Sequence, residues 1–102
     1  MARIYALYRA PTDAAAFESY YFDTHVPLAK TIPGLRNYEV TRRPLTALGG
    51  AAPYYMIATL SFDSRAAIDA ALVSQQGQAV AADLAKFATG GVDVLIADTE
   101  PV

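Results

Sequence analysis

His25 is the side chain in this sequence with the clearest chemical potential, because it is the only histidine and there is no cysteine. An imidazole titrates with a pKa of about 6.5, so near neutral pH it can take a proton from a bound molecule and return it. Tyr21 lies four residues earlier, one turn away in a helix, so the two side chains can interact. This pair predicts general acid–base catalysis. The alternative is a structural histidine at a helix end that satisfies a backbone carbonyl.

Aromatic side chains are the second group that can form a site, since the sequence has seven Tyr and four Phe. Such rings can enclose a flat apolar ligand, and tyrosine hydroxyls can orient it. Packing in the core or in a subunit interface is the competing explanation for each ring. The residues that we assign to a pocket on this ground are Tyr8, Phe17, Tyr20, Tyr38 and Phe87.

Three arginines, Arg36, Arg42 and Arg43, are a weaker third group. They could hold a carboxylate or phenolate. Solvated charges on a strand edge, which also deter aggregation, are the favoured interpretation.

Composition excludes several functional classes. Without cysteine there is no disulfide, thiolate nucleophile or cysteine metal site, and one histidine cannot form a metal cluster within one chain. The net charge is −2 and the eight Lys and Arg residues form no basic stripe, so we expect no nucleic-acid partner. The apolar runs fall well short of the roughly 20 residues that span a bilayer, and no signal-peptide pattern is present. We expect one cytoplasmic domain, residues 1–102, with no membrane partner and no cofactor.

The elements that must position these residues follow the order β-α-β-β-α-β. Apolar residues at helical spacing predict a first helix from about Asp13 to Leu28, which Pro27 should bend or restart near residues 24–27. A short helix over 64–73 and an amphipathic helix over 78–88 make up the second α element. Strand patterns occupy four segments, residues 3–9, 35–43, 54–62 and 92–97.

This order predicts a ferredoxin-like α+β fold, with one antiparallel sheet and all helices on one face. Three of the strands are nevertheless apolar on both faces. Such strands require burial on both sides, and a large exposed apolar sheet is rare in a monomer. The sequence therefore predicts a homodimer, sheet against sheet.

The segment from Phe17 to Ala29, which contains the run His25-Val-Pro-Leu-Ala, resembles the signature of the EthD-like family. The run Ile32-Pro-Gly-Leu-Arg36 follows it in the same order. Residues 62–64 and 74–83 are similar to the second half of that family. The resemblance implies a dimeric α+β barrel with a pocket between sheet and helices in each subunit. It also favours the functional interpretation of His25.

We therefore expect a small cofactor-independent enzyme that acts on an apolar, aromatic or polyketide-like small molecule. His25, with Tyr21, would move a proton in an isomerisation, cyclisation, decarboxylation or oxygenation. We expect His25 to be partly exposed at a pocket mouth, with one ring nitrogen donating to a carbonyl freed by the kink. Two alternatives stay open: a non-catalytic ligand-binding or accessory protein of a degradation pathway, and a haem protein with His25 as axial ligand.

Overall fold

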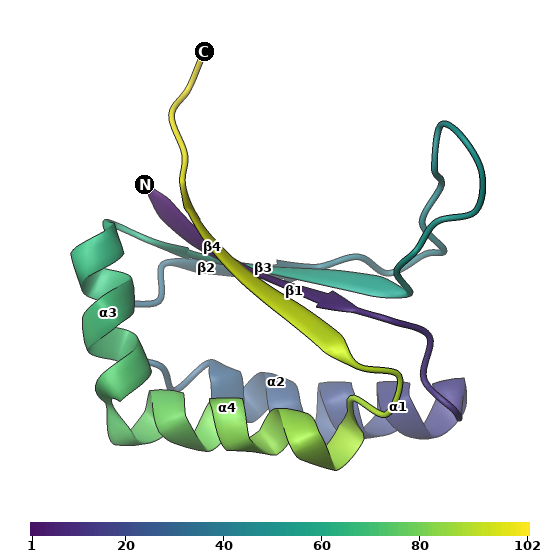
Figure 1. Cartoon of the computed structure of the whole chain (residues 1–102). Coiled ribbons are helices and arrows are strands. Elements are labelled where there is room, and N and C mark those ends of the chain that lie inside the picture. The colour runs from purple at the N-terminus through teal and green to yellow at the C-terminus, as the bar shows by residue number, and fades with distance from the viewer.

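One four-stranded antiparallel sheet forms the frame of the computed structural model, which describes residues 1–102 (Figure 1). The spatial order of its strands is β2-β3-β1-β4. In the middle of the sheet Ala6 lies opposite both Ala58 and Val94. This topology confirms the predicted ferredoxin-like α+β fold. The strands are β1 (Ala2–Tyr8), β2 (Asn37–Val40), β3 (Met56–Phe62) and β4 (Val92–Asp98).

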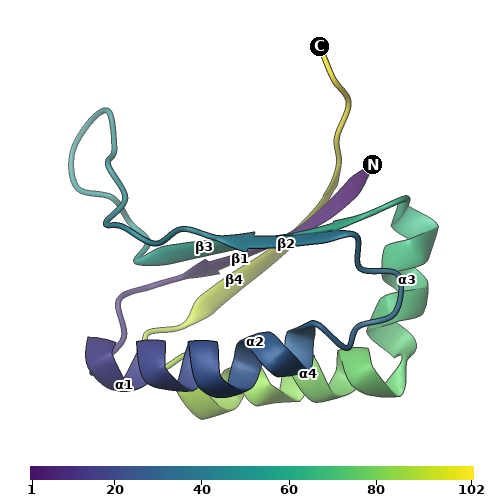
Figure 2. The same ribbon diagram turned by 180° about the vertical axis from the view of Figure 1, so that it is seen from behind.

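All helices lie against the same face of the sheet (Figures 1 and 2). Side-chain caps fix where three of them begin: Asp13, Ser64 and Ser74 each accept a hydrogen bond from a backbone N–H in the first turn that follows. No helix has the length and apolar character needed to cross a bilayer. The helices are α1 (Ala14–Tyr20), α2 (Val26–Ala29), α3 (Arg65–Val73) and α4 (Gln75–Phe87).

A π-helical segment, η1 (Tyr21–His25), joins α1 to α2 and confirms the predicted interruption before Pro27. The N–H of Val26 bonds to the carbonyl of Tyr21, five residues back, so one extra residue is accommodated in this turn. Pro27 has no N–H and would clash with a regular helical turn behind it. The wider turn changes the direction in which the side chains of η1 point.

The core lies between the sheet and the helices. On β1 the residues facing the helices are buried, and they alternate with half-buried residues on the other face. At one end of the core the Tyr8 ring packs edge-on against Phe17 and Tyr21, with ring centres 5.5 and 5.6 Å apart. Phe87 of α4 completes this aromatic cluster.

The other face of the sheet has no covering element in the chain (Figure 2). It carries Tyr5 and Leu7 from β1, Ile57 from β3 and Leu95 from β4, and Leu95 is 56% exposed. The loop between β2 and β3 and the tail after β4 both project on this uncovered side (Figure 1).

Candidate functional site

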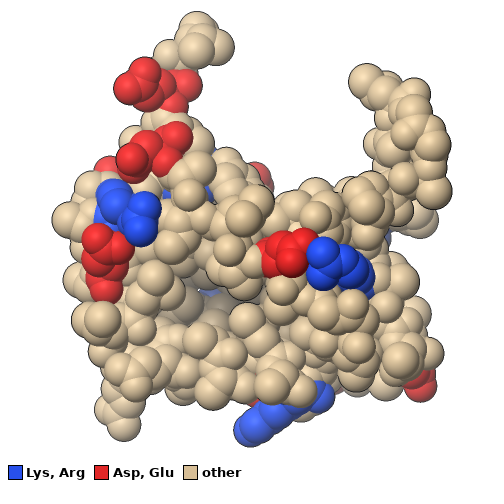
Figure 3. Space-filling view, in the orientation of Figure 1, with Lys and Arg blue, Asp and Glu red and all other residues tan.

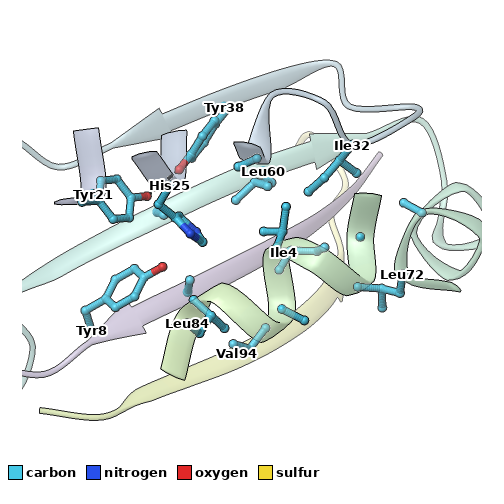
Figure 4. Close-up of a pocket in the computed structure, with 17 residues that line it drawn as sticks. Ile4, Tyr8, Tyr21, His25, Ile32, Tyr38, Leu60, Leu72, Leu84 and Val94 are labelled. Carbon is cyan, nitrogen blue, oxygen red and sulfur yellow. Dashed lines mark hydrogen bonds between the residues drawn. The ribbon is translucent and has the colours of Figure 1, made fainter. Parts of the chain in front are cut away.

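A cavity of about 90 Å³ lies between the sheet and the helices (Figure 4). Its wall is mostly hydrocarbon, since 15 of the 17 residues that line it are hydrophobic. Leu72 and Val94 line it while being 40% and 48% exposed, so they mark its mouth. The space-filling view shows a hollow on this side of the molecule (Figure 3).

His25 closes the inner end of the cavity, and its partner is a buried carboxylate. His25 is 3% exposed and Asp83 of α4 is 4% exposed. The Nδ1 of His25 lies 2.9 Å from Oδ2 of Asp83, and the Tyr20 hydroxyl donates to Oδ1 over 2.7 Å. Phe87 packs on the imidazole with ring centres 4.6 Å apart. The carboxylate is therefore held from two sides.

This geometry corrects two expectations for His25. The imidazole is not partly exposed, and the group that accepts its hydrogen bond is the carboxylate of Asp83 rather than a carbonyl freed by the kink. The physical reason is the π-helical segment. A regular helix would place His25 on the flank of the apolar stripe, whereas the extra residue in η1 turns it inward toward α4.

Burial and pairing set the charge states of this pair. Burial lowers the pKa of the His25 imidazole below its ordinary value, and Asp83 offsets that effect only in part. Burial alone would raise the pKa of the Asp83 carboxyl, but hydrogen bonds from Tyr20 and His25 outweigh it and the pKa is lowered. An ionised carboxylate only accepts, so the hydrogen of the neutral imidazole sits on Nδ1. Nε2 of His25, a residue that lines the cavity, then carries a lone pair with no hydrogen-bond partner in the protein.

Three tyrosine hydroxyls lie at the same end of the cavity. Tyr8 comes from the end of β1, Tyr21 from η1 and Tyr38 from β2, and all three line it. The hydroxyls of Tyr21 and Tyr38 are 2.6 Å apart. Burial raises the pKa of all three phenols, so each keeps its hydrogen near neutral pH.

The structure thus brings together four of the predicted site residues, His25, Tyr8, Tyr21 and Tyr38. The other three predicted pocket residues do not line this cavity. Phe17 and Phe87 pack in the aromatic cluster with Tyr8, because their bulky rings occupy the space where α1 and α4 approach each other. Tyr20 points to Asp83 instead and supports it.

Asp83 is the site residue that the sequence analysis did not single out. The signal was present in the helix over 78–88, where Val80, Leu84 and Phe87 form an apolar stripe. Asp83 lies three residues after Val80, on the same side of the helix. A carboxylate within an apolar stripe needs a buried partner, and the single histidine is the natural one.

The three arginines lie away from the cavity. Arg36 forms an exposed ion pair with Asp63 over 2.8 Å. The guanidinium of Arg42 stacks on the ring of Phe22, 4.2 Å from its centre. Surface roles account for both.

Comparison with known proteins decides the family. Residues 9–91 match the model of the EthD domain. The chain belongs to the EthD family. A relative of this EthD protein is an 11.0 kDa protein from the thcB–thcC intergenic region of Rhodococcus erythropolis, 40% identical over 103 residues that cover 100% of this chain and 98% of the relative. An EthD family protein of Bacillus halodurans has a similar solved structure, with 33% identity, a TM-score of 0.89 and coverage of 98% of this chain and 99% of that one.

More distant structures share the fold alone. A dimeric ferredoxin-like protein of Thermobifida fusca is 19% identical with a TM-score of 0.70, covering 96% of this chain and 90% of that one. SnoaB of Streptomyces nogalater, a cofactor-independent oxygenase, is 15% identical with a TM-score of 0.63, covering 99% and 93%. The fold of this EthD protein is therefore one on which dimers and a cofactor-independent enzyme occur.

Proposed function

We propose that this EthD protein is a small cofactor-independent enzyme in which His25 moves a proton on an apolar molecule bound between the sheet and the helices. The observation that carries the proposal is the buried imidazole, which lines the cavity, is held at Nδ1 by Asp83 and has no hydrogen-bond partner in the protein at Nε2. A base held in one tautomer beside a ligand space is the arrangement that general acid–base catalysis requires. The isomerisation, cyclisation, decarboxylation and oxygenation expected from the sequence each contain a proton transfer.

The size and lining of the cavity limit the ligand. The enclosed space of about 90 Å³ is smaller than the cavity of about 150 Å³ that holds benzene in an engineered protein core. A single ring therefore fits only if part of it lies at the open mouth near Leu72 and Val94. A larger aromatic or polyketide-like molecule would insert one end.

The two alternatives fare differently against this geometry. A haem does not fit, because its four pyrrole rings need far more room than one benzene and the cavity is smaller than one that holds benzene. A non-catalytic binding or accessory protein would use the same cavity. The aliphatic lining from Ile4, Leu60 and Leu84 suits binding, whereas the His25–Asp83 pair has no purpose in apolar binding alone.

A titration of the single histidine by NMR tests the observation that carries the proposal. We expect an imidazole pKa below 6.5 and a neutral tautomer with its hydrogen on Nδ1, because burial outweighs the attraction of Asp83. Between the lowered pKa and 6.5 the unfolded chain binds more protons than the folded one. The free energy of unfolding should therefore fall as the pH is lowered through this window, and recover above 6.5. A pKa above 6.5, or a hydrogen on Nε2, would contradict the proposed base.

We also propose that the protein is a homodimer joined through the uncovered face of the sheet. The apolar residues there, and the loop and tail that project beside them, fit a second copy facing them. We expect light scattering to give twice the chain mass. Leu95→Arg should shift the protein toward monomer, because it puts a charge in the interface. Val73→Arg, at an exposed position of the helical layer, is the matched control and should leave the dimer intact.

A further inference from the structure

The polar atoms in the cavity are few, and they gather at one end. Among the 17 lining residues only Tyr8, Tyr21, His25 and Tyr38 have polar side-chain atoms. Asp83 takes one of them, the Nδ1 of His25. Three hydroxyls and one nitrogen therefore remain at the end where η1 meets β1 and β2 (Figure 4), and the opposite end is hydrocarbon. Such a wall suits a ligand with one polar end.

The number of hydroxyl hydrogens at this end of the cavity indicates which kind of atom the polar end of the ligand must have. Each tyrosine brings one hydrogen, and Tyr21 and Tyr38 share one of theirs in the 2.6 Å contact. Even if the Tyr21 hydroxyl also contacts Tyr8, three hydroxyls in a row have three hydrogens and only two contacts among them. At least one hydrogen is therefore unused within the row, on the hydroxyl at one of its ends, and both end residues, Tyr8 and Tyr38, line the cavity. The hydrogen bond that the last hydroxyl of such a row donates is stronger than that of an isolated hydroxyl, because its neighbours polarise it.

The remaining polar atom has the opposite character. Nε2 of His25 is an acceptor, because Nδ1 carries the hydrogen that Asp83 accepts. Figure 4 shows the Tyr8 hydroxyl and the imidazole of His25 directed toward the same part of the cavity. The ligand must therefore have an oxygen that accepts a hydrogen bond and, next to it, a hydrogen that His25 can take.

We infer that the substrate is a small, largely hydrocarbon carbonyl compound with a hydrogen on the carbon next to the carbonyl group, and that the tyrosine hydroxyls bind the carbonyl oxygen. This inference rests on the proposed function, since it uses His25 as the base. Neutral hydroxyls aimed at an oxygen that becomes negative stabilise the charge as it develops.

The step is a reversible enolisation. Nε2 of His25 takes the proton from the carbon next to the carbonyl, and the electrons of that C–H bond form a carbon–carbon double bond. The carbonyl π electrons move to oxygen, where the enolate accepts hydrogen bonds from the tyrosines. The imidazolium, paired with Asp83, returns its proton to the same carbon or, in a conjugated substrate, to another one. No external oxidant or reductant is required.

Two small probes test this inference. The first is exchange of the hydrogens next to the carbonyl of cyclohexanone for deuterium in D₂O, followed by NMR with equal concentrations of protein and of free imidazole as reference. The second is the binding of phenol, which has the planar carbon frame and hydroxyl of an enol, against toluene, which has the same shape without the oxygen. The variants are Tyr8→Phe with Tyr38→Phe, and His25→Asn. Tyr54→Phe is the control, because its hydroxyl bonds to Asp93 away from the cavity.

We expect the protein to exceed imidazole in exchange rate, and the double tyrosine variant to lose about a hundredfold of that rate. Phenol should bind about tenfold more tightly than toluene to the unmodified protein, and this preference should be smaller in the double variant, which keeps only Tyr21 and His25 at the polar end. Equal binding of the two probes to the unmodified protein, or exchange no faster than imidazole, would overturn the inference. Exchange that needs His25 but not the tyrosine hydroxyls would overturn it while leaving the proposed function standing. Exchange that is unchanged in His25→Asn would overturn the proposed function.

Discussion

Replacement of His25 by asparagine is expected to lower kcat by about two to four orders of magnitude on any substrate that the protein turns over, which is the usual contribution of a general acid–base group. The asparagine amide can still donate to Asp83 in place of Nδ1, but it has no basic nitrogen to present to the cavity. Affinity for an apolar ligand should change little, since the hydrocarbon wall is intact. The measurements are steady-state kinetics and ligand titration on the same protein sample.

Asparagine is preferable to alanine at this position because His25 is buried and paired. Alanine would leave one oxygen of the buried Asp83 without its partner, at a cost of about 1–3 kcal/mol in the free energy of unfolding. Lost activity in His25→Ala would then mix folding with chemistry. If His25→Asn kept its full kcat while it folded normally, His25 would be a structural residue and another group would have to carry the proton transfer.

Gly77→Ala is expected to be the most destabilising single methyl addition near the site. The new Cβ would overlap the carbonyl oxygen of Ala71 and lie 3.2 Å from the Cα of Leu72, both in the backbone of α3. Alanine gains about 1 kcal/mol over glycine in helix propensity, but this overlap can be relieved only by moving one helix away from the other. We expect a net loss of about 3 kcal/mol, the upper end for overpacking.

The melting temperature measures this effect, and a loss of that size lowers it by about 12 °C or more in a chain of this length. Gly49→Ala is the matched control, because a Cβ there meets no atom within 4 Å. We expect its free energy of unfolding to change by less than about 0.5 kcal/mol. A Gly77→Ala protein as stable as the control would mean that α3 and α4 are not closely packed at this junction.

The fold could be predicted from the sequence because its determinants are local. Alternating strands, the turn at Pro33-Gly34 and the break at Pro27 each act within a few residues. Strand β2 was the main exception, as residues 35–43 were predicted and only Asn37–Val40 are in the strand. Leu35 still belongs to the turn that Gly34 makes with its φ of 82°, and the ladder between β2 and β3 ends at Val40, opposite Ala58.

The candidate site was only partly predictable, because its geometry depends on contacts between distant segments. The identity of His25, Tyr8, Tyr21 and Tyr38 could be inferred from residue types. The inward direction of His25 could not, because it follows from the π-helical segment, and a helical period of 3.6 residues does not describe that segment. The role of Asp83 needed α4 to lie beside η1, 58 residues away in sequence from His25.

The two ends of the cavity are anchored to the protein in different ways. At the inner end the polar side chains are hydrogen-bonded to one another and packed against the core, so a large substitution there changes folding and chemistry together. At the mouth Leu72 and Val94 are partly exposed, and exchanging them for other apolar residues costs little free energy of folding. Under the proposed function, selection can therefore reshape ligand preference at the mouth while the proposed proton-transfer pair stays intact, which makes this small scaffold readily evolvable toward new ligands.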